Sequence, residues 1–353
     1  MQAAVYHGRR DVRIESVEDP GPPRSGELLL EVIRAGICGT DVSEYLHGPQ
    51  AIPVHRPDPA TGYQGPVILG HEFLGRVVEV GPGVEGFRPG QRVVSGAGVW
   101  CGQCAWCRAG RTNLCERYYT LGLQADGGLA EYVRVPAKTC VHVPEECPDD
   151  AAALAQPLAV AVHAVNRAGV VPGQSVAVVG VGAIGSLIVA AAARRGARPL
   201  VAVDVKPERL RAAASLGATH CVQGSGSQAA QAVHEATGGY GAEVVIESSG
   251  VPGSADLACA MVRRGGRILQ VGLHHEPEPV ALRDLVLREV DLITTVAHVC
   301  PVDLPEAVRL LADGTLAQLV VDRVIGLQRL VPDGLMALAE GRAQGKILVD
   351  PRA

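Results

Sequence analysis

The sequence predicts an α/β protein of two parts, a β-rich domain followed by a doubly wound parallel sheet. Its 353 residues are more than one hydrophobic core usually serves, and 47% of them are hydrophobic, enough to bury large cores. Residues 1–150 read as short strands interrupted by glycine and proline. From Ala151 onward, strand-like and helix-like segments alternate, a pattern typical of a parallel sheet covered on both faces.

The β-rich part is irregular. Apolar and polar side chains alternate over residues 12–15 and, in part, over residues 28–33. A long connection over residues 48–65 carries Pro49, Pro53, Pro57 and Pro59. Loops of this length in compact domains are usually functional or mobile, which makes this one a candidate functional segment.

The parallel-sheet part has a more regular order. We expect strands over residues 175–179, 199–204, 244–247 and 267–271, and helices from 185 to about 195, over 207–216 and over 253–263. The tail is expected to contain helices over 304–312 and 330–344 and a last strand over 347–349.

A glycine-rich turn follows the first of these strands. Gly180, Gly182 and Gly185 form a G-x-G-x-x-G pattern that also contains Ile184 and opens an Ala-rich helix. The three glycines permit a tight turn, close approach of the backbone to a pyrophosphate, and close packing of helix on strand. Free N–H groups at the start of the helix favour phosphate. This context predicts a dinucleotide site, and it shows that the uncharged run over 176–193 is strand, turn and helix rather than a membrane span.

Asp204 ends the second strand of this part, about twenty residues after the last glycine. A carboxylate there accepts hydrogen bonds from the adenosine ribose and repels a 2′-phosphate, which favours NAD over NADP. The alternative is an ordinary surface acid beside a helix. Arg209 could line the adenine edge or simply be a solvated helix residue, and Gly272 lies at a strand end that should face the nicotinamide.

Four cysteines lie within fifteen residues, with the spacing C-x2-C-x2-C-x7-C. Cys101, Cys104, Cys107 and Cys115 supply the four soft ligands of a tetrahedral zinc site with no vacancy for chemistry. The surrounding segment is rich in glycine and charge and offers little core of its own. We therefore predict a structural zinc lobe; the alternatives are two disulfides or four free thiols.

A second group of metal ligands is scattered along the first domain. Cys38 lies in a GICGTD segment, and His71 and Glu72 directly follow an apolar strand. A thiolate, an imidazole and a carboxylate from different loops make an incomplete zinc shell with one position left for substrate or water. Each residue alone is weak evidence, because single buried cysteines and His-Glu pairs are usually structural.

Composition excludes several other classes. The net charge of -5 gives no electrostatic footprint for nucleic acid. Residues 1–11 contain no apolar signal segment, so we expect a cytoplasmic protein whose remaining cysteines are reduced. We expect the protein to bind neither a membrane nor a nucleic acid.

Four segments resemble the zinc-dependent medium-chain alcohol dehydrogenases: GICGTD at 36–41, GPVILGHEFLGRVVEVGPGV at 65–84, the four-cysteine lobe, and VAVVGVGAIG at 176–185. Within that family, EYLHGP at 44–49 and the proline-rich loop are most similar to 2,3-butanediol dehydrogenases, with sorbitol and threonine dehydrogenases nearby. The resemblance implies a GroES-like catalytic domain over 1–155 with its zinc lobe at about 100–116. It also implies a Rossmann domain over 156–296, a return to the catalytic domain over 297–353, and a homodimer or homotetramer.

The resemblance further implies the reaction. A secondary alcohol or vicinal diol, of the 2,3-butanediol kind, would lose a hydride to NAD and become a ketone, with one catalytic and one structural zinc per subunit. Thr40 would pass on the hydroxyl proton. The alternatives are a polyol, sugar-alcohol or amino-alcohol substrate on the same scaffold, or a non-catalytic NAD-binding protein.

Two positions depart from the family pattern. Gln156 stands where relatives usually carry Glu, Asp or Cys as, or beside, the last zinc ligand, and a neutral amide is a weaker ligand. Ser43 stands where some relatives have His at the outer end of the proton path; it could only relay through water. His47 and His55 are the candidates for a substitute base; the alternative, which we favour, is that both are surface loop residues.

Overall fold

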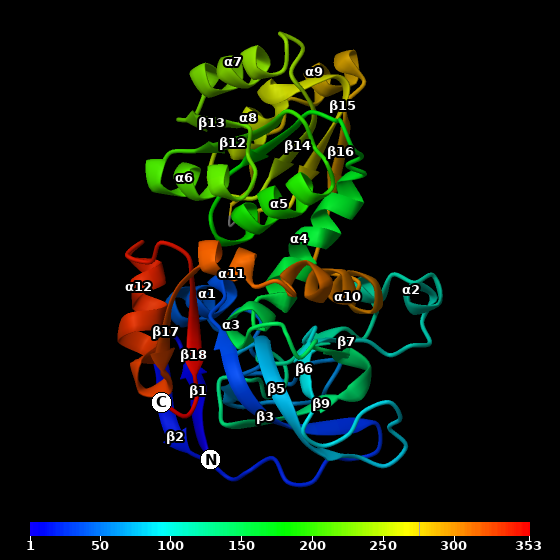
Figure 1. The fold of residues 1–353 in the computed structure, drawn as a ribbon, viewed down its shortest axis with the longest axis vertical. Helices are drawn as coiled ribbons and strands as arrows, with labels where there is room; N and C mark the ends of the chain where they lie inside the picture. The colour runs from blue at the N-terminus through cyan, green and yellow to red at the C-terminus, as the bar shows by residue number, and fades with distance from the viewer. Residues whose placement is uncertain (275) are drawn as a thin grey trace. The chain divides into compact units, whose positions relative to one another are not determined.

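The structure is a computed structural model that describes residues 1–274 and 276–353. The chain forms two compact units. Unit 1 contains Met1–Ala159 and Val299–Ala353, and unit 2 contains Val160–His298. Unit 1 is therefore built from both ends of the chain, which the blue and red ends of the ribbon show side by side in Figure 1.

Unit 1 is a β-rich body. A seven-stranded sheet has the order β10-β6-β5-β3-β18-β17, with β9 also pairing with β3; a three-stranded sheet has the order β2-β1-β4, and β7 pairs with β8. The strands are β1 Gln2–Gly8, β2 Asp11–Ser16, β3 Glu27–Gly36, β4 Val67–Ile68, β5 Glu72–Val80, β6 Arg92–Ser95, β7 Gly98–Val99, β8 Tyr119–Thr120, β9 Tyr132–Pro136, β10 Cys140–His142, β17 Val321–Gly326 and β18 Lys346–Asp350.

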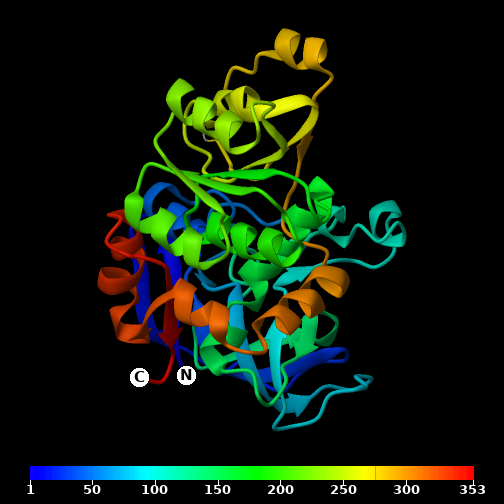
Figure 2. The ribbon, with the colours of Figure 1, turned by 45° about the horizontal axis from the view of Figure 1, so that its top comes forward.

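Short helices surround this sheet. They are α1 Gly39–His47, α2 Ala105–Arg108, α3 Asp149–Ala152, α10 Cys300–Leu311, α11 Thr315–Val320 and α12 Met336–Ala339, with α4 Ala155–Ala168 running from unit 1 into unit 2. Three 3-10 turns (η1 Thr112–Leu114, η2 Ala137–Thr139, η3 Leu327–Arg329) and one π-helical turn (η4 Leu330–Leu335) complete the unit. Figures 1 and 2 show the segment around α2 extending from the sheets of unit 1.

The helix expected over 330–344 is shorter and less regular than predicted. A 3-10 turn and a π turn lead into α12, which ends at Ala339. Pro332 and Gly334 lie in the π turn, and both residues disfavour a regular α-helix. The helix expected over 304–312 is present as α10.

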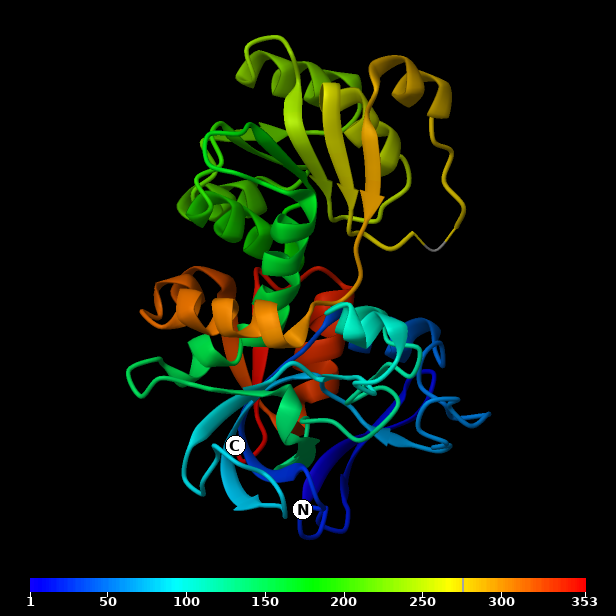
Figure 3. The ribbon, with the colours of Figure 1, turned by 90° about the vertical axis from the view of Figure 1, so that its right-hand side faces the viewer.

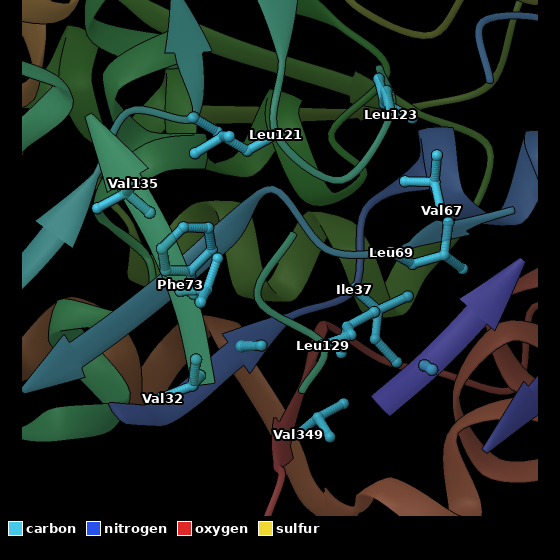
Figure 4. Close-up of a cluster of buried hydrophobic side chains, with 14 of the residues drawn as sticks. Val32, Ile37, Val67, Leu69, Phe73, Leu121, Leu123, Leu129, Val135 and Val349 are labelled. Carbon is cyan, nitrogen blue, oxygen red and sulfur yellow. The ribbon is translucent and has the colours of Figure 1, made fainter. Parts of the chain in front are cut away.

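The core of unit 1 lies directly beneath the residues predicted to bind metal. Ile37 and Phe73 are each 1% exposed and belong to one apolar cluster with Val349, which is fully buried. Figure 4 shows these side chains among the buried leucines and valines of the cluster. Ile37 precedes Cys38, and Phe73 follows Glu72 with its side chain on the opposite face of β5. Packing of the core therefore fixes the backbone on which the polar residues stand.

Unit 2 is a six-stranded parallel sheet of order β13-β12-β11-β14-β15-β16. Figure 3 shows β14, β15 and β16 as neighbouring arrows that point the same way. The strands are β11 Val176–Val179, β12 Leu200–Asp204, β13 His220–Gln223, β14 Ala242–Glu247, β15 Val262–Gln270 and β16 Asp291–Thr294; the helices are α5 Ala183–Arg194, α6 Pro207–Ser215, α7 Ser227–Ala236, α8 Ser254–Met261 and α9 Leu282–Arg288.

The strand order of unit 2 reverses at β11, which pairs with β12 on one side and β14 on the other. Helices α5 and α6 cover one face of the sheet, and α7 and α8 cover the other (Figure 1). This is the doubly wound arrangement that the alternating pattern predicted. Dinucleotides bind such sheets at the carboxyl ends of the strands, next to the point of reversal.

None of the helices in the described part of the chain is both long and apolar enough to span a bilayer.

Candidate active site

Three side chains of unit 1 converge as candidate metal ligands. Cys38 is the N-cap residue of α1, His71 follows the strand β4, and Glu72 begins β5. One ligand atom from each of the three lies within 4.8 Å of the others. His71 and Glu72 are 6% and 1% exposed, and Cys38 is half-buried. The arrangement brings together the three residues that the sequence singled out.

Asp41 contacts two of these three residues. Its Oδ2 accepts the backbone N–H of Cys38 at 2.9 Å, and its Oδ1 lies 3.7 Å from His71 Nδ1. Asp41 is fully buried, and within the described residues neither Oδ1 nor His71 Nδ1 has a hydrogen-bond partner. The Nδ1 side of the ring thus faces Asp41 without a hydrogen bond, and Nε2 is the nitrogen that we expect to bind a metal.

The charges of the cluster favour a cation. Burial alone would lower the pKa of His71, but the Cys38 sulfur and the Asp41 carboxylate outweigh it and raise the pKa to about 10. Burial raises the pKa of Asp41, partly offset by His71. Two acidic groups and one thiol around a buried imidazole thus attract positive charge. Because a metal binds only the neutral imidazole, loading the site must release a proton.

Lys346, the first residue of β18, is part of this cluster and was not singled out from the sequence. Its ammonium forms an ion pair with Glu72 Oε2 and donates to the carbonyl of Ile37 at 2.9 Å. The two charged side chains are 3% and 1% exposed. Burial alone would lower the pKa of Lys346, but Glu72 and Cys38 outweigh it and raise it. The signal in the sequence was a cation directly before the three apolar residues 347–349 of this strand.

These residues fit zinc. Sulfur, nitrogen and oxygen donors from Cys38, His71 and Glu72 are the donor set that zinc takes in sites with an open position. A carboxylate beside the second ring nitrogen is a usual companion of a zinc-bound histidine, and Asp41 lies in that position beside Nδ1 of His71. Lys346 competes with a metal for the Glu72 carboxylate, so Glu72 is the weakest of the three ligands.

The remaining predicted site residues lie on the helices α1 and α4. Thr40 Oγ1 is 3.7 Å from Cys38 Sγ, in the first turn of α1. One turn further, Ser43 donates to Gln50 Oε1 at 3.3 Å, at the start of the proline-rich loop. Gln156 lies in the first turn of α4 and is half-buried. Its part in the metal shell stays a prediction.

A second group of possible ligands is formed by the four-cysteine lobe. The sulfurs of Cys101, Cys104, Cys107 and Cys115 all lie within 4.8 Å of one another. The Sγ atoms of Cys101 and Cys104 are 3.9 and 3.5 Å from that of Cys107, too far apart for disulfides. All ten cysteines of the chain are free thiols.

Backbone N–H groups of the lobe point at the sulfurs. Cys101 Sγ accepts from Gln103 and Cys104, both at 3.4 Å, and Cys115 Sγ accepts from Cys101 at 3.2 Å. Backbone N–H groups of Glu116 and Cys107 lower the pKa of Cys104 to about 6. Donors placed around thiols stabilise thiolates, the form that binds zinc. The lobe thus fits a closed site with four sulfur ligands.

In unit 2 the glycine-rich turn joins β11 to α5. Gly180 has φ +80°, and Gly182 is the N-cap residue of α5. A Cβ on Gly185 would lie 1.9 Å from the carbonyl oxygen of Gly180, so no larger residue fits there. A Cβ on Gly182 would meet only Arg209, at 3.8 Å, which leaves open space on that side for a ligand. Ile184 is half-buried in the first turn of the helix.

Asp204, at the carboxyl end of β12, faces this turn. Its Oδ2 accepts the N–H of Val181 at 2.9 Å, and its Oδ1 accepts the N–H of Lys206 at 2.9 Å. Arg209 Nη1 lies 3.5 Å from Oδ2. Asp204 is 6% exposed, so the reading as an ordinary surface acid does not fit the structure. A cavity of about 610 Å³ is lined by Gly180, Gly182, Asp204, Arg209, Gly226 and Ser248 among others.

Gly272 lies just beyond β15, where a Cβ would be 2.3 Å from the N–H nitrogen of Gly250 and 2.5 Å from Glu247 Oε2. The turns after β14 and β15 are therefore pressed together. Sequence reasoning did not single out Glu247, although a carboxylate at the end of an apolar strand was a visible signal.

Comparison with known proteins assigns the chain to a family. Residues 24–145 match the alcohol dehydrogenase GroES-like domain, and residues 183–331 match the zinc-binding dehydrogenase domain. The (R,R)-butanediol dehydrogenase of Bacillus subtilis is 35% identical over 99% of this chain and 100% of its own length. The chain belongs to the zinc-dependent medium-chain alcohol dehydrogenases. The sorbitol dehydrogenase of the same organism is 34% identical to this dehydrogenase over 83% of this chain and 81% of its own length.

Solved structures agree with this assignment of the dehydrogenase. The crystal structure of the Bacillus subtilis 2R,3R-butanediol dehydrogenase has a TM-score of 0.91, with 99% of each chain covered and 35% identity. An alcohol dehydrogenase of Escherichia coli CFT073 complexed with NADH has a TM-score of 0.88 at 26% identity, with 99% of each chain covered. A zinc-binding dehydrogenase of Sinorhizobium meliloti bound to NADP has a TM-score of 0.87 at 31% identity, also with 99% of each chain covered.

Proposed function

We propose that the dehydrogenase oxidises a secondary alcohol or vicinal diol, of the 2,3-butanediol kind, to a ketone with NAD as the hydride acceptor. The observation that carries the proposal is the convergence of Cys38, His71 and Glu72 in one buried cluster. The similarity to a butanediol dehydrogenase over the whole chain supports the substrate class.

Zinc bound by Cys38, His71 and Glu72 would supply a Lewis acid that makes an alcohol hydroxyl more acidic. The chain's own residues have separate tasks. Asp41 lies beside the imidazole of His71, and Lys346 neutralises the carboxylate of Glu72. We assign Thr40, whose Oγ1 lies 3.7 Å from Cys38 Sγ, as the residue that passes on the hydroxyl proton. We assign Ser43, which donates to Gln50 at 3.3 Å, to the outer end of the proton path, where it would relay through water.

NAD is proposed over NADP because of Asp204. Both of its oxygens are already fixed by backbone N–H groups, so the carboxylate is held where an adenosine ribose would lie. A 2′-phosphate would approach this buried negative charge. Arg209 lies 3.5 Å from the carboxylate of Asp204, so part of the positive charge of Arg209 is already compensated by Asp204.

A polyol or sugar alcohol is the second candidate substrate class. It is favoured by the similarity to the sorbitol dehydrogenase of Bacillus subtilis. A panel of diols, polyols and amino alcohols, assayed by NADH absorbance, separates the two. Highest kcat/KM on a four-carbon vicinal diol supports the first, and highest kcat/KM on a polyol supports the second.

Metal analysis of matched cysteine variants tests the site itself. Cys38→Ser should lose one of two zinc ions per subunit and all turnover, while it still binds NADH. Cys140→Ser is the control, because Cys140 is also a free thiol of unit 1 but belongs to neither ligand group. NADH binding without turnover on any alcohol in the wild type would instead support a non-catalytic NAD-binding protein.

We also infer a homo-oligomer, a dimer or tetramer, that uses the edge of the sheet in unit 2. β16 is an edge strand, and unpaired edges invite pairing with another chain. Large apolar side chains are exposed on β16 and on α9 beside it: Leu282 at 64%, Val286 at 77%, Leu287 at 62% and Leu292 at 42%. A second copy placed against this face would cover them. Light scattering on the wild type and on Val286→Lys tests this, and an unchanged mass in the variant would contradict it.

We also propose a cytoplasmic location. All ten cysteines are free thiols, which favours a reducing compartment.

A further inference from the structure

A carboxylate is buried at the carboxyl end of β14, and among the described residues the one basic side chain within ion-pair distance is His274, whose Nε2 lies 3.9 Å from Glu247 Oε2. Glu247 is 0% exposed, and no Lys or Arg in the described part of the chain forms an ion pair with it. Burying a charge is costly unless hydrogen bonds compensate it. The donors around Glu247 therefore show which parts of the fold depend on this charge.

Glu247 ties two turns together. Its Oε1 accepts the N–H of Ser249 at 2.7 Å, the hydroxyl of Ser249 at 2.5 Å and the N–H of Gly250 at 3.1 Å. Its Oε2 accepts the side-chain amide of Gln270 at 2.5 Å. One oxygen thus holds the turn after β14, and the other holds the end of β15.

The network continues from Gln270 across the next turn. The amide nitrogen of Gln270 also donates to the carbonyl of Gly272 at 2.8 Å and lies 3.1 Å from His274 Nε2. His274 Nδ1 is 3.9 Å from Glu278 Oε1, and Glu278 Oε2 accepts the N–H of Gly253, the N-cap residue of α8. The contacts thus lead back to Gly253, which follows the turn after β14.

The turn after β14 borders the space where a dinucleotide would lie, and the turn at Gly272 packs against it, since a Cβ on Gly272 would be 2.3 Å from the nitrogen of Gly250. Ser248, Ser249 and Gly253 line the cavity of about 610 Å³ described above. A Cβ on Gly180 would be 2.5 Å from the Cβ of Ser249, so the turn that Glu247 holds lies directly against the glycine-rich turn.

The topology decides which half of the ligand this network faces. The pyrophosphate belongs at the start of α5, and the adenosine ribose belongs at Asp204 on β12. The dinucleotide crosses the point of strand reversal at β11, so its other half must extend over the ends of β14 and β15. The turns held by Glu247 and Gln270 lie on that side.

We propose that Glu247 is a positioning residue for the nicotinamide half of the cofactor, acting through Gln270 on the turn at Gly272. The inference rests on the proposed use of NAD. Glu247 touches no reacting atom; it sets the backbone of the two turns that the nicotinamide riboside must approach.

The substitution Glu247→Gln separates the two sides of the network. The new amide oxygen still accepts from Ser249 and Gly250, but its NH₂ group then faces the NH₂ group of Gln270. Rotating the amide of Gln270 would relieve this clash but would place its oxygen against the carbonyl of Gly272. The variant therefore loosens the turn at Gly272, while Ser248 keeps its own bond to the carbonyl of Gly180 at 2.6 Å.

Calorimetric titration of the full-length protein with NADH and with ADP-ribose, which lacks nicotinamide, tests this. Loss of one hydrogen bond to a charged group corresponds to about tenfold or more in an equilibrium constant, and we expect the lower end because this bond lies within the protein. Glu247→Gln should therefore bind NADH about tenfold more weakly and ADP-ribose within about twofold of the wild type. Glu243→Gln is the control: it lies on the same strand and accepts from a backbone N–H and a hydroxyl, both of Ser175, away from the cavity.

Equal affinities of Glu247→Gln and wild type for NADH would overturn the inference, and so would an equal loss for both ligands, which would indicate a general structural effect. If Glu247→Gln does not fold, Gln270→Met decides in its place. It removes the amide without adding bulk and should give the same selective loss for NADH. A wild type that binds no NADH would refute the proposed function instead.

Discussion

Removing the charge of Lys346 should destabilise unit 1 strongly. In Lys346→Met the carboxylate of Glu72 would stay buried, since the surrounding apolar cluster leaves it 1% exposed. The hydrogen bond from Lys346 to the carbonyl of Ile37 would also be lost, directly before the ligand Cys38. Methionine keeps most of the apolar stem, so the change isolates the ammonium group.

The expected magnitude follows from the burial of both partners. Removing one partner of a buried pair typically costs about 3–5 kcal/mol, because the other charge is left uncompensated. No allowance for solvent screening is needed at side-chain exposures of 3% and 1%. An exposed pair offers the contrast: Arg342 and Glu340 are 51% and 48% exposed, and Arg342→Met should cost about 0–1 kcal/mol.

Urea unfolding followed by tryptophan fluorescence measures this difference. Both tryptophans, Trp100 and Trp106, lie in unit 1, so the signal reports that unit. Removing zinc from all samples with a chelator keeps the metal from compensating the charge of Glu72 in the variant. Glu72→Gln combined with Lys346→Met should recover much of the lost stability, because no charge is then left unpaired. A loss below about 1 kcal/mol in Lys346→Met would refute the reasoning, since it would mean that Glu72 is not desolvated.

Three further predictions concern the metal and cofactor residues. Cys104→Ser should lower the zinc content from two to one per subunit by elemental analysis and lower the stability of the lobe, since three thiolates close the site less well; two retained zinc ions would contradict the assignment. Gly182→Ala should leave the melting temperature near that of wild type but weaken NADH binding, whereas Gly185→Ala should lower the melting temperature itself, because its Cβ would lie 1.9 Å from the Gly180 carbonyl oxygen. Gln156→Glu should raise zinc affinity at the Cys38 site in a chelator competition; an unchanged affinity would show that position 156 does not contribute.

The parallel sheet was predictable because its signals are local. Buried strands such as β11 and β12 are continuous apolar runs, and the glycine pattern between β11 and α5 records a turn that few other residues allow. The expected strands and helices of unit 2 correspond to β11, β12, β14, β15, α5, α6 and α8 within a few residues. The elements of unit 2 that were not expected are β13, α7, α9 and β16. β13 and β16 are edge strands with exposed residues, and exposed edges lack a continuous apolar run.

The tail was less predictable. Residues 330–344 have helical spacing of apolar side chains, but Pro332 and Gly334 override it and divide the segment into a π turn and a short helix. β17, which pairs in parallel with β18, was not expected at all, because its partner lies more than twenty residues further along. Long-range pairing of this kind leaves little trace in local periodicity.

The sequence by itself determined which residue types are available: three dissimilar ligands in the first domain, four closely spaced thiols, and a glycine turn followed by an acid. Spacing along the chain carries that information because ligand chemistry and turn geometry are local properties. Only the tertiary structure decided that Lys346, more than 270 residues after Glu72, lies against its carboxylate, and that Glu247 links two turns through Gln270. Burial decides such contacts: a charge removed from water must meet a partner inside the fold, and which partner it meets depends on how the strands pack.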